Sequence, residues 1–430
     1  MKLWQRENTV ISEQVQQFTV GRDREFDLLL AKYDVEGSLA HTAMLRHVGL
    51  LPDGEYILIK AELETIYRDI ENGNFSLRDD VEDIHSQIEL MLTEKLGDAG
   101  KKIHSGRSRN DQVAVDIKLY LRAEVLEIKR EVLTLFDLLL HLSDLHKDKL
   151  LPGYTHLQLA MPSSFGLWFG AYAESLVDDM SLLATAHKMA DKNPLGSGAG
   201  YGSSFPLDRA LTTRLLNFGG LHYNSVYAQM SRGKTERLVS MALSGIAATL
   251  SRLSMDACLY MNQNFGFISF PEVLTTGSSI MPHKKNPDVF ELIRGKCNRI
   301  QSTPNELALL TNNLPSGYHR DMQLTKEILF PAIEDMKACL QMAHLMLSNV
   351  IVKDNILDDD KYKYLFTVEK VNNLVNSGIP FRDAYKLVAE EVQNGTFSYS
   401  GELHHIHEGS IGNLCNEDIK RSMREIVELF

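Results

Sequence analysis

The sequence predicts an all-α fold, with three mostly helical domains and a long central helical bundle. Prolines are absent between Pro52 and Pro152 and between Pro206 and Pro271, and a proline inside a helix costs about 3 kcal/mol. Within these intervals apolar residues recur every three or four positions, which is the period of an amphipathic helix. The intervals therefore leave room for helices far longer than the average of about 11–12 residues.

Five long helices are expected in the middle of the chain. Their apolar stripes need partners, so this part is predicted to form a bundle. Some stripes are wide enough to be buried on two sides, which predicts that bundles from several chains associate. Smaller helical domains are expected at 1–108 and 351–430, on either side of a central domain at 109–350. The expected helices are 113–145, 166–189, 235–267, 288–300 and 323–350, the last with a kink or restart at Pro331.

Composition limits the classes of partner. Lys and Arg number 45 against 57 Asp and Glu, a net charge of −12, and this balance disfavours a nucleic-acid-binding surface. No run approaches about 18 apolar residues, so no membrane span is expected, and Met1–Val10 lacks the apolar core of a signal peptide. The four cysteines are scattered, which disfavours a disulfide framework or a structural zinc site. A cytoplasmic protein without a nucleic-acid or membrane partner is expected.

Two glycine-rich segments, Gly196–Gly202 and Gly277–Pro282, are predicted to be loops. Neither matches a nucleotide-binding fingerprint. Gly233-Lys234-Thr235 resembles the end of a phosphate-binding loop but lacks the glycine five residues earlier. No nucleotide cofactor is therefore expected.

The polar segment Ser105–Gln112 directly precedes the first long helix. A helix N-terminus offers free backbone N–H groups and a positive dipole, which suit a carboxylate. Arg107 and Arg109 could add paired hydrogen bonds. The alternative is an ordinary helix cap made by Asn110 or Asp111, with the arginines in solvent.

A second polar segment, Gly153–Gln158, lies between Pro152 and Pro162. Its Thr155-His156 pair could bind an oxygen and transfer a proton. The alternative is a structural histidine, since the chain has 15 of them.

A third polar segment, Thr275–Pro287, contains serines and lysines around Gly277 and Pro282. A serine hydroxyl acts as a base only where cations and backbone N–H groups stabilise its alkoxide. Lys284 and the N–H groups of this segment could do so for Ser278. The alternative is a flexible loop between domains.

The third segment resembles the signature G-S-S-x-M-P-x-K-x-N of the fumarase/aspartase superfamily. The resemblance implies a central bundle that tetramerises into a twenty-helix core, and a β-elimination that releases fumarate. The matching residues are Gly277, Ser278, Ser279, Met281, Pro282, Lys284 and Asn286.

Gly106–Gln112 narrows the resemblance to the argininosuccinate lyase family. That family cleaves argininosuccinate into arginine and fumarate, the last step of arginine biosynthesis. The resemblance implies a homotetramer whose active sites are shared between subunits, and a reaction that needs neither metal nor cofactor. Similar segments elsewhere are Glu82–His85, Pro152–Gln158, Pro194–Ala199, Asp321 with Gln323, and Lys326 with Glu327.

The resemblance also implies roles for individual residues. Ser278 matches the proposed base, His156 the histidine of the site and Glu291 its carboxylate partner. Lys284 and Asn286 match residues that hold and neutralise the substrate. His156, or a water that it orients, is the candidate proton donor to the leaving nitrogen. Matches to carboxylate contacts are Ser108, Arg109, Asn110 and Thr155, and matches to contacts with the arginine end are Arg232, Tyr318, Gln323 and Lys326.

Several positions depart from the family pattern. Asp23 stands where a serine is usual, and a charge there would repel a substrate carboxylate. Ser231, Gly233 and Leu324-Thr325 replace usual acidic residues. His283 is typical of adenylosuccinate lyases, so adenylosuccinate lyase or another fumarate-releasing lyase stays an alternative.

A non-catalytic, crystallin-like structural protein is a third reading, because a fold alone does not prove an activity. His404, His405 and His407 resemble a metal cluster, but a solvated polar turn is favoured and no metal is expected.

Overall fold

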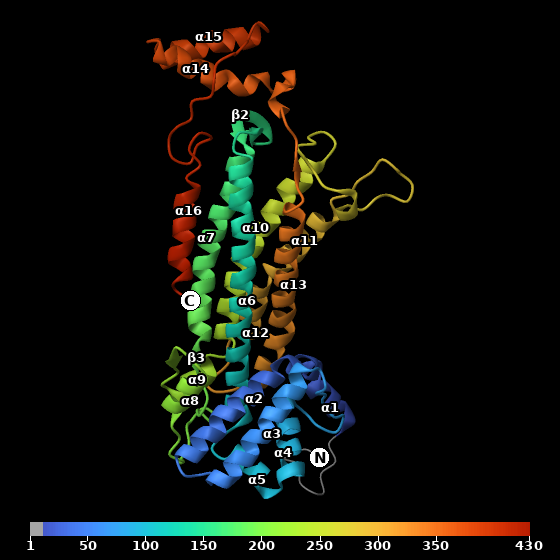
Figure 1. The fold of residues 1–430 in the computed structure, drawn as a ribbon, viewed down its shortest axis with the longest axis vertical. Helices are drawn as coiled ribbons and strands as arrows, with labels where there is room; N and C mark the ends of the chain where they lie inside the picture. The colour runs from blue at the N-terminus through green and yellow to red at the C-terminus, as the bar shows by residue number, and fades with distance from the viewer. Residues whose placement is uncertain (1–11) are drawn as a thin grey trace.

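The computed structural model describes residues 12–430, which form an elongated molecule built mainly of helices (Figure 1). This confirms the predicted all-α class. The segment Met1–Val10, in which no signal peptide was expected, lies outside the described residues.

The central bundle contains all five predicted long helices. α13 continues through Pro331 without restarting. α10 ends before the predicted Phe267, because Asn262 takes up an extended backbone conformation. The bundle helices are α6 (Arg109–Leu145), α7 (Phe165–Ala190), α10 (Lys234–Met261), α11 (Asp288–Ile300) and α13 (Thr325–Leu347), with the short α12 (Thr303–Leu310) beside them.

The periodic apolar stripes form the bundle core. On α6 the completely buried stripe includes Val125, Ile128, Val132, Leu135 and Leu139, as the helical period requires. α10 is long and apolar enough to cross a membrane by length and composition alone. However, 56% of its most apolar window is buried against the rest of the protein, so packing within the bundle accounts for that composition.

The N-terminal helices cover one end of the bundle and have a core of their own, which includes Val35, Ile59, Leu63 and Ile88. α2 reaches beyond this core and packs on α6 and α13. The helices are α1 (Glu13–Val20), α2 (Asp23–His47), α3 (Asp53–Glu71), α4 (Ile84–Leu96), α5 (Asp98–Lys101) and η1 (Lys102–His104).

Short elements connect the bundle helices. A hairpin of β1 (Leu150–Thr155) and β2 (Gln158–Ser164) lies at the bundle end farthest from the N-terminal helices (Figure 1). The remaining connecting elements are β3 (Lys192–Asn193), α8 (Arg209–Leu215), β4 (Gly220–Leu221), α9 (Ser225–Met230), β5 (Ile268–Ser269), η2 (Glu272–Leu274) and η3 (Arg320–Leu324).

The last part of the chain has a small third core around Val371, Ala384, Val388 and Phe397. α16 leaves this region and packs along α7. The boundaries predicted near residues 108 and 350 stay predictions. The elements are β6 (Ile351–Val352), η4 (Ile356–Asp358), η5 (Asp360–Phe366), α14 (Thr367–Asn376), α15 (Phe381–Gln393) and α16 (Asn416–Val427).

Candidate functional site

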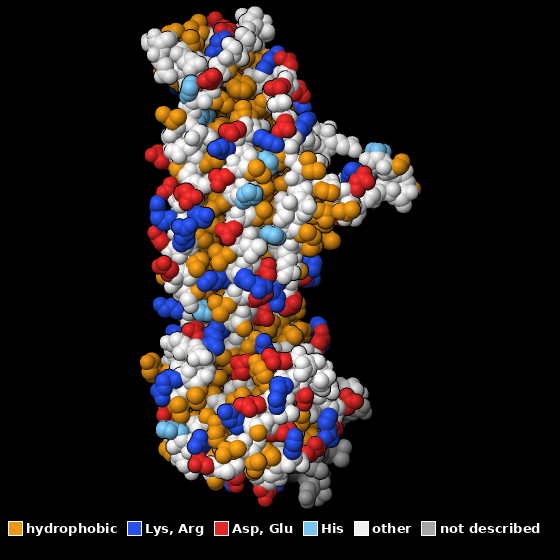
Figure 2. Space-filling view, viewed as in Figure 1, with side chains coloured by type: hydrophobic (Ala, Val, Ile, Leu, Met, Phe, Trp, Pro, Cys, Tyr) orange, Lys and Arg blue, Asp and Glu red, His pale blue; other side chains and the backbone are white. Residues whose placement is uncertain are grey.

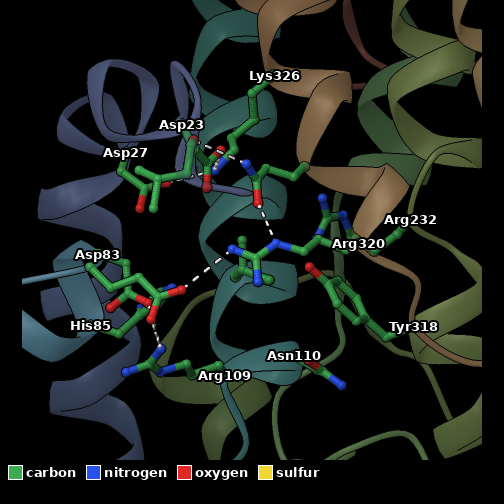
Figure 3. Close-up of a pocket in the computed structure, with 14 residues that line it drawn as sticks. Asp23, Asp27, Asp83, His85, Arg109, Asn110, Arg232, Tyr318, Arg320 and Lys326 are labelled. Carbon is green, nitrogen blue, oxygen red and sulfur yellow. Dashed lines mark hydrogen bonds and ion pairs between the residues drawn. The ribbon is translucent and has the colours of Figure 1, made fainter. Parts of the chain in front are cut away.

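A polar pocket of about 200 Å³ lies where α2, the start of α6, η3 and α13 meet (Figure 3). It brings together six of the predicted substrate-binding residues from distant parts of the chain. These are Arg109, Asn110, Arg232, Tyr318, Gln323 and Lys326.

The start of α6 forms one side of this pocket. Ser108 caps the helix in a capping box with Asp111, whose Oδ1 accepts from the Ser108 backbone N–H at 2.8 Å. The alternative with Asn110 or Asp111 as the cap and solvated arginines is therefore wrong. Arg109 lies against the pocket, with NH1 2.9 Å from Asp83 Oδ2.

Arg107 does not face the pocket, although the sequence suggested that it could bind a carboxylate there. It is buried and donates to Ser38 Oγ at 3.0 Å. Asp111 Oδ2 accepts from the backbone N–H groups of Gly196 and Gly198, each at 3.0 Å. These two bonds fasten the glycine-rich loop to the start of α6.

Lys326 on α13 forms the opposite side, between two carboxylates of α2. Its Nζ lies 2.5 Å from Asp23 Oδ1 and 2.6 Å from Asp27 Oδ1. Burial opposes the charged ammonium, but Asp27 and Asp23 outweigh it and raise the pKa of Lys326. Asp23, the departure from the family pattern, therefore faces the pocket and is held by a cation.

The η3 segment completes the pocket. Gln323 donates to the backbone oxygens of Thr19 and Val20 at 3.1 and 3.2 Å. Arg320, which the sequence reasoning missed, donates to Thr19 O at 3.0 Å and lies 3.4 Å from Glu82 Oε1. Its position three residues before Gln323 was the only available signal.

Arg232 enters the pocket from the turn before α10. Its Nε donates to Glu236 Oε1 at 2.9 Å and its NH2 to Met322 O at 3.1 Å. Its NH1 is buried and has no hydrogen-bond partner among the described residues. A pocket ligand with an acceptor oxygen could occupy that position.

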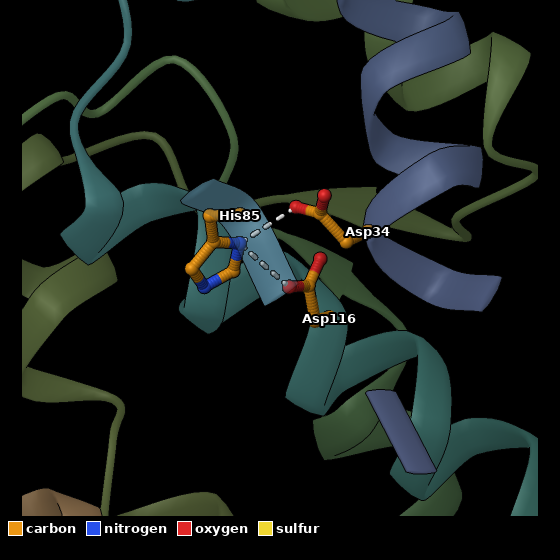
Figure 4. Close-up of side chains that lie close together, drawn as sticks. All are labelled: Asp34, His85 and Asp116. Carbon is orange, nitrogen blue, oxygen red and sulfur yellow. Dashed lines mark hydrogen bonds and ion pairs between the residues drawn. The ribbon is translucent and has the colours of Figure 1, made fainter. Parts of the chain in front are cut away.

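His85, which lines the pocket, lies between Asp34 and Asp116 (Figure 4). His85 Nδ1 is 2.8 Å from Asp34 Oδ1 and 3.7 Å from Asp116 Oδ2. Burial opposes the imidazolium, but Asp34 and Asp116 raise the pKa of His85 to about 10. At 2.8 Å the contact with Asp34 has the geometry of a hydrogen bond that a protonated Nδ1 donates to the carboxylate.

The predicted base lies in the loop between η2 and α11. Ser278 Oγ accepts from the backbone N–H groups of Ile280 and Met281 at 3.3 and 3.1 Å. Asn286 closes the loop by donating from Nδ2 to Gly277 O at 3.2 Å. Lys284 is exposed on the same loop, which projects from the side of the bundle (Figure 1).

Thr155 and His156 are exposed at the tip of the β1–β2 hairpin. His156 and Leu157 have φ angles of 54° and 58°, which is the geometry of a two-residue type I′ turn. Glu291 is exposed on α11, and no hydrogen bond joins its side chain to His156 among the described residues of the chain. A single chain therefore keeps the hairpin, the serine loop and the pocket apart.

Comparisons with known proteins show the family to which this chain belongs. The sequence pattern of a lyase family matches residues 10–302. An argininosuccinate lyase of Phocaeicola vulgatus is 58% identical over 100% of this chain and 96% of its own. One from Thermotoga neapolitana is 39% identical over 91% of this chain and 98% of its own.

The chain belongs to the argininosuccinate lyase family. It is thus a lyase, and its substrate is a small molecule. The structure of an EDDS lyase with formate has a TM-score of 0.76 at 21% identity and covers 98% of this chain and 90% of that one. A fumarate lyase from Mesorhizobium has a TM-score of 0.72 at 17% identity, covering 99% and 93%. At these low identities, the likeness shows that this chain shares its fold with both structures.

His283 and the histidine group of His404, His405 and His407 take no part in the pocket. His283 is exposed beside Lys284. His405 lies 2.8 Å from Glu369, while His404 is exposed and 3.9 Å from Glu402.

Proposed function

We propose that this chain cleaves argininosuccinate into arginine and fumarate, in active sites that several copies of the chain build together. The observation that carries this proposal is the separation of two chemically complementary parts. The pocket is lined by charged and polar side chains that suit the charged amino-acid end of the substrate. Ser278 and His156 lie on exposed segments far from this pocket. A neighbouring chain would have to supply those segments.

Ser278 is proposed to remove the proton next to the succinyl carboxylate. Its Oγ accepts hydrogen bonds from two backbone N–H groups, and such fixed donors stabilise an alkoxide. Removing the proton builds a second negative charge on the carboxylate. Lys284 and Asn286 of the same loop would hold that charge, and donors fixed where charge develops lower the barrier.

His156, or a water that it orients, would then protonate the leaving guanidino nitrogen. Its φ of 54° supports such a role, because non-glycine residues with positive φ cluster at functional sites. Glu291 is proposed as the carboxylate partner of His156 across a subunit boundary. Thr155, Ser108 and Asn110 would contact the substrate carboxylates.

A homotetramer is proposed because the bundle exposes apolar side chains along its length (Figure 2). Large exposed apolar surfaces are typical of protein interfaces. We also propose a cytoplasmic location, in whose reducing environment the four cysteines would stay free, as they are in the structure. The exposed apolar residues of the bundle helices include Leu126, Leu182, Met241, Met255, Leu292, Leu309, Met342 and Leu345.

A fumarate absorbance assay tests the proposal. Purified protein should release fumarate from argininosuccinate and not from adenylosuccinate. Release only from adenylosuccinate would favour the alternative lyase, and release from neither substrate would favour the structural role.

A further inference from the structure

The pocket wall formed by α2 and α13 carries two carboxylates for one ammonium group. Asp23 and Asp27 both contact Lys326, at 2.5 and 2.6 Å. The side chains of Asp27 and Lys326 are 4% and 3% exposed, and that of Asp23 is 21% exposed. This cluster therefore holds one negative charge in excess at a place where little water can screen it.

The arginines of the pocket do not fully neutralise that excess, because they have partners of their own, Arg320 with Glu82 at 3.4 Å among them. Arg109 NH1 lies 2.9 Å from Asp83, and Arg232 Nε lies 2.9 Å from Glu236. An uncompensated buried charge is costly, so a proton or an external cation has to balance it. Burial, opposed by Lys326 and reinforced by Asp27, raises the pKa of Asp23 to about 6.

We infer that Asp23 is a specificity residue that binds the α-ammonium group at the arginine end of the substrate. This rests on the proposed function, in which the pocket receives that end. The Nη1 of Arg232, which has no hydrogen-bond partner among the described residues, would donate to the α-carboxylate beside it. A substrate whose amino group is acylated brings no cation and leaves the excess charge of the cluster uncompensated.

The α-ammonium group is remote from the bond that breaks. Its contact with Asp23 is therefore equally strong in the ground state and the transition state, and its loss raises KM while kcat stays unchanged. This separates recognition by Asp23 from a role in the chemistry.

The test uses the purified full-length enzyme and follows fumarate release, with L-arginine or Nα-acetyl-L-arginine as competitors. The wild type should bind L-arginine at least about tenfold more tightly, as expected for one charge-assisted hydrogen bond. Asp23→Asn and Asp23→Ser should remove most of this preference and raise KM for argininosuccinate about tenfold. Glu25→Gln removes a carboxylate from an exposed position of the same helix and should change none of these values.

Changes of KM and of L-arginine binding in the opposite direction would overturn the inference. If Asp23 only obstructs Lys326, Asp23→Ser will lower KM and strengthen binding of L-arginine. An unchanged preference in both variants would overturn it as well. Absence of fumarate release by the wild type would instead contradict the proposed function, and calorimetric binding of the two arginine compounds would then still test Asp23.

Discussion

At the residue scale, the backbone around Ser278 decides what its hydroxyl can do. Two N–H groups of its own loop point at Oγ, so an alkoxide has donors before any substrate arrives. Ser278 also lies in an irregular loop, outside any helix or strand. Its chemistry and its contribution to stability are therefore separable.

Ser278→Ala should lower kcat by several orders of magnitude, because removing a proton-transfer group and its alkoxide removes most of the acceleration of this step. The thermal midpoint should stay within about 1 °C of the wild type, since surface substitutions change stability little. Fumarate release and a melting curve on the same samples measure both effects. A variant with a near-normal rate would remove Ser278 from the role of base.

His85 should make stability depend on pH. Its pKa is about 10 in the folded protein, against 6.5 for an ordinary histidine. Because the pKa of His85 is raised in the folded state, its protonation stabilises the folded protein fully below about pH 6.5. This stabilisation is lost as the pH rises through about 10. The thermal midpoint of the wild type should therefore fall between pH 7 and pH 10 more steeply than that of His85→Gln.

His404→Gln is the matched control for this comparison, because it removes an exposed histidine. It should keep the wild-type slope. Parallel curves for the wild type and His85→Gln would contradict the assignment of a charged His85.

At the scale of elements, local signals predicted the helices well. α11 begins at Asp288 directly after Pro287, as predicted, because proline marks the boundary locally. The β1–β2 hairpin was not predicted, since its turn residues, His156 and Leu157, are not those that usually adopt positive φ. Long-range pairing also escaped prediction: Lys326 meets Asp27 across 299 positions of the chain.

The capping box that begins α6 gives a prediction at this scale. Ser108→Ala removes the side chain that accepts the Asn110 N–H and should destabilise the protein by about 1 kcal/mol. Because α6 positions Arg109, KM for argininosuccinate should rise as well. Denaturant unfolding and steady-state kinetics check the two effects, and Thr134→Ala, an exposed hydroxyl within α6, is the control. Identical stability of Ser108→Ala and the wild type would contradict the role of the cap.

At the scale of the whole molecule, the sequence motifs predicted which residues form one site. A single chain brings together the pocket residues but neither the serine loop nor the hairpin. Arg109, Arg232, Gln323 and Lys326 share a pocket, and the substrate contacts that the resemblance implied for them stay predictions. The serine loop and the hairpin cannot be placed beside them within one chain, because the bundle separates them (Figure 1). The proposed assembly would close that distance, and the sequence pattern of a single chain does not encode the geometry of an assembly.

Co-expression of two inactive variants tests shared active sites most directly. Mixed tetramers of Ser278→Ala and Arg109→Ala chains should regain fumarate release, because some sites would combine an intact loop from one chain with an intact pocket from another. Mixed tetramers of Ser278→Ala and Lys284→Ala chains should stay inactive, since both changes lie on the same loop. No recovery in the first mixture, despite verified mixed tetramers, would contradict the account.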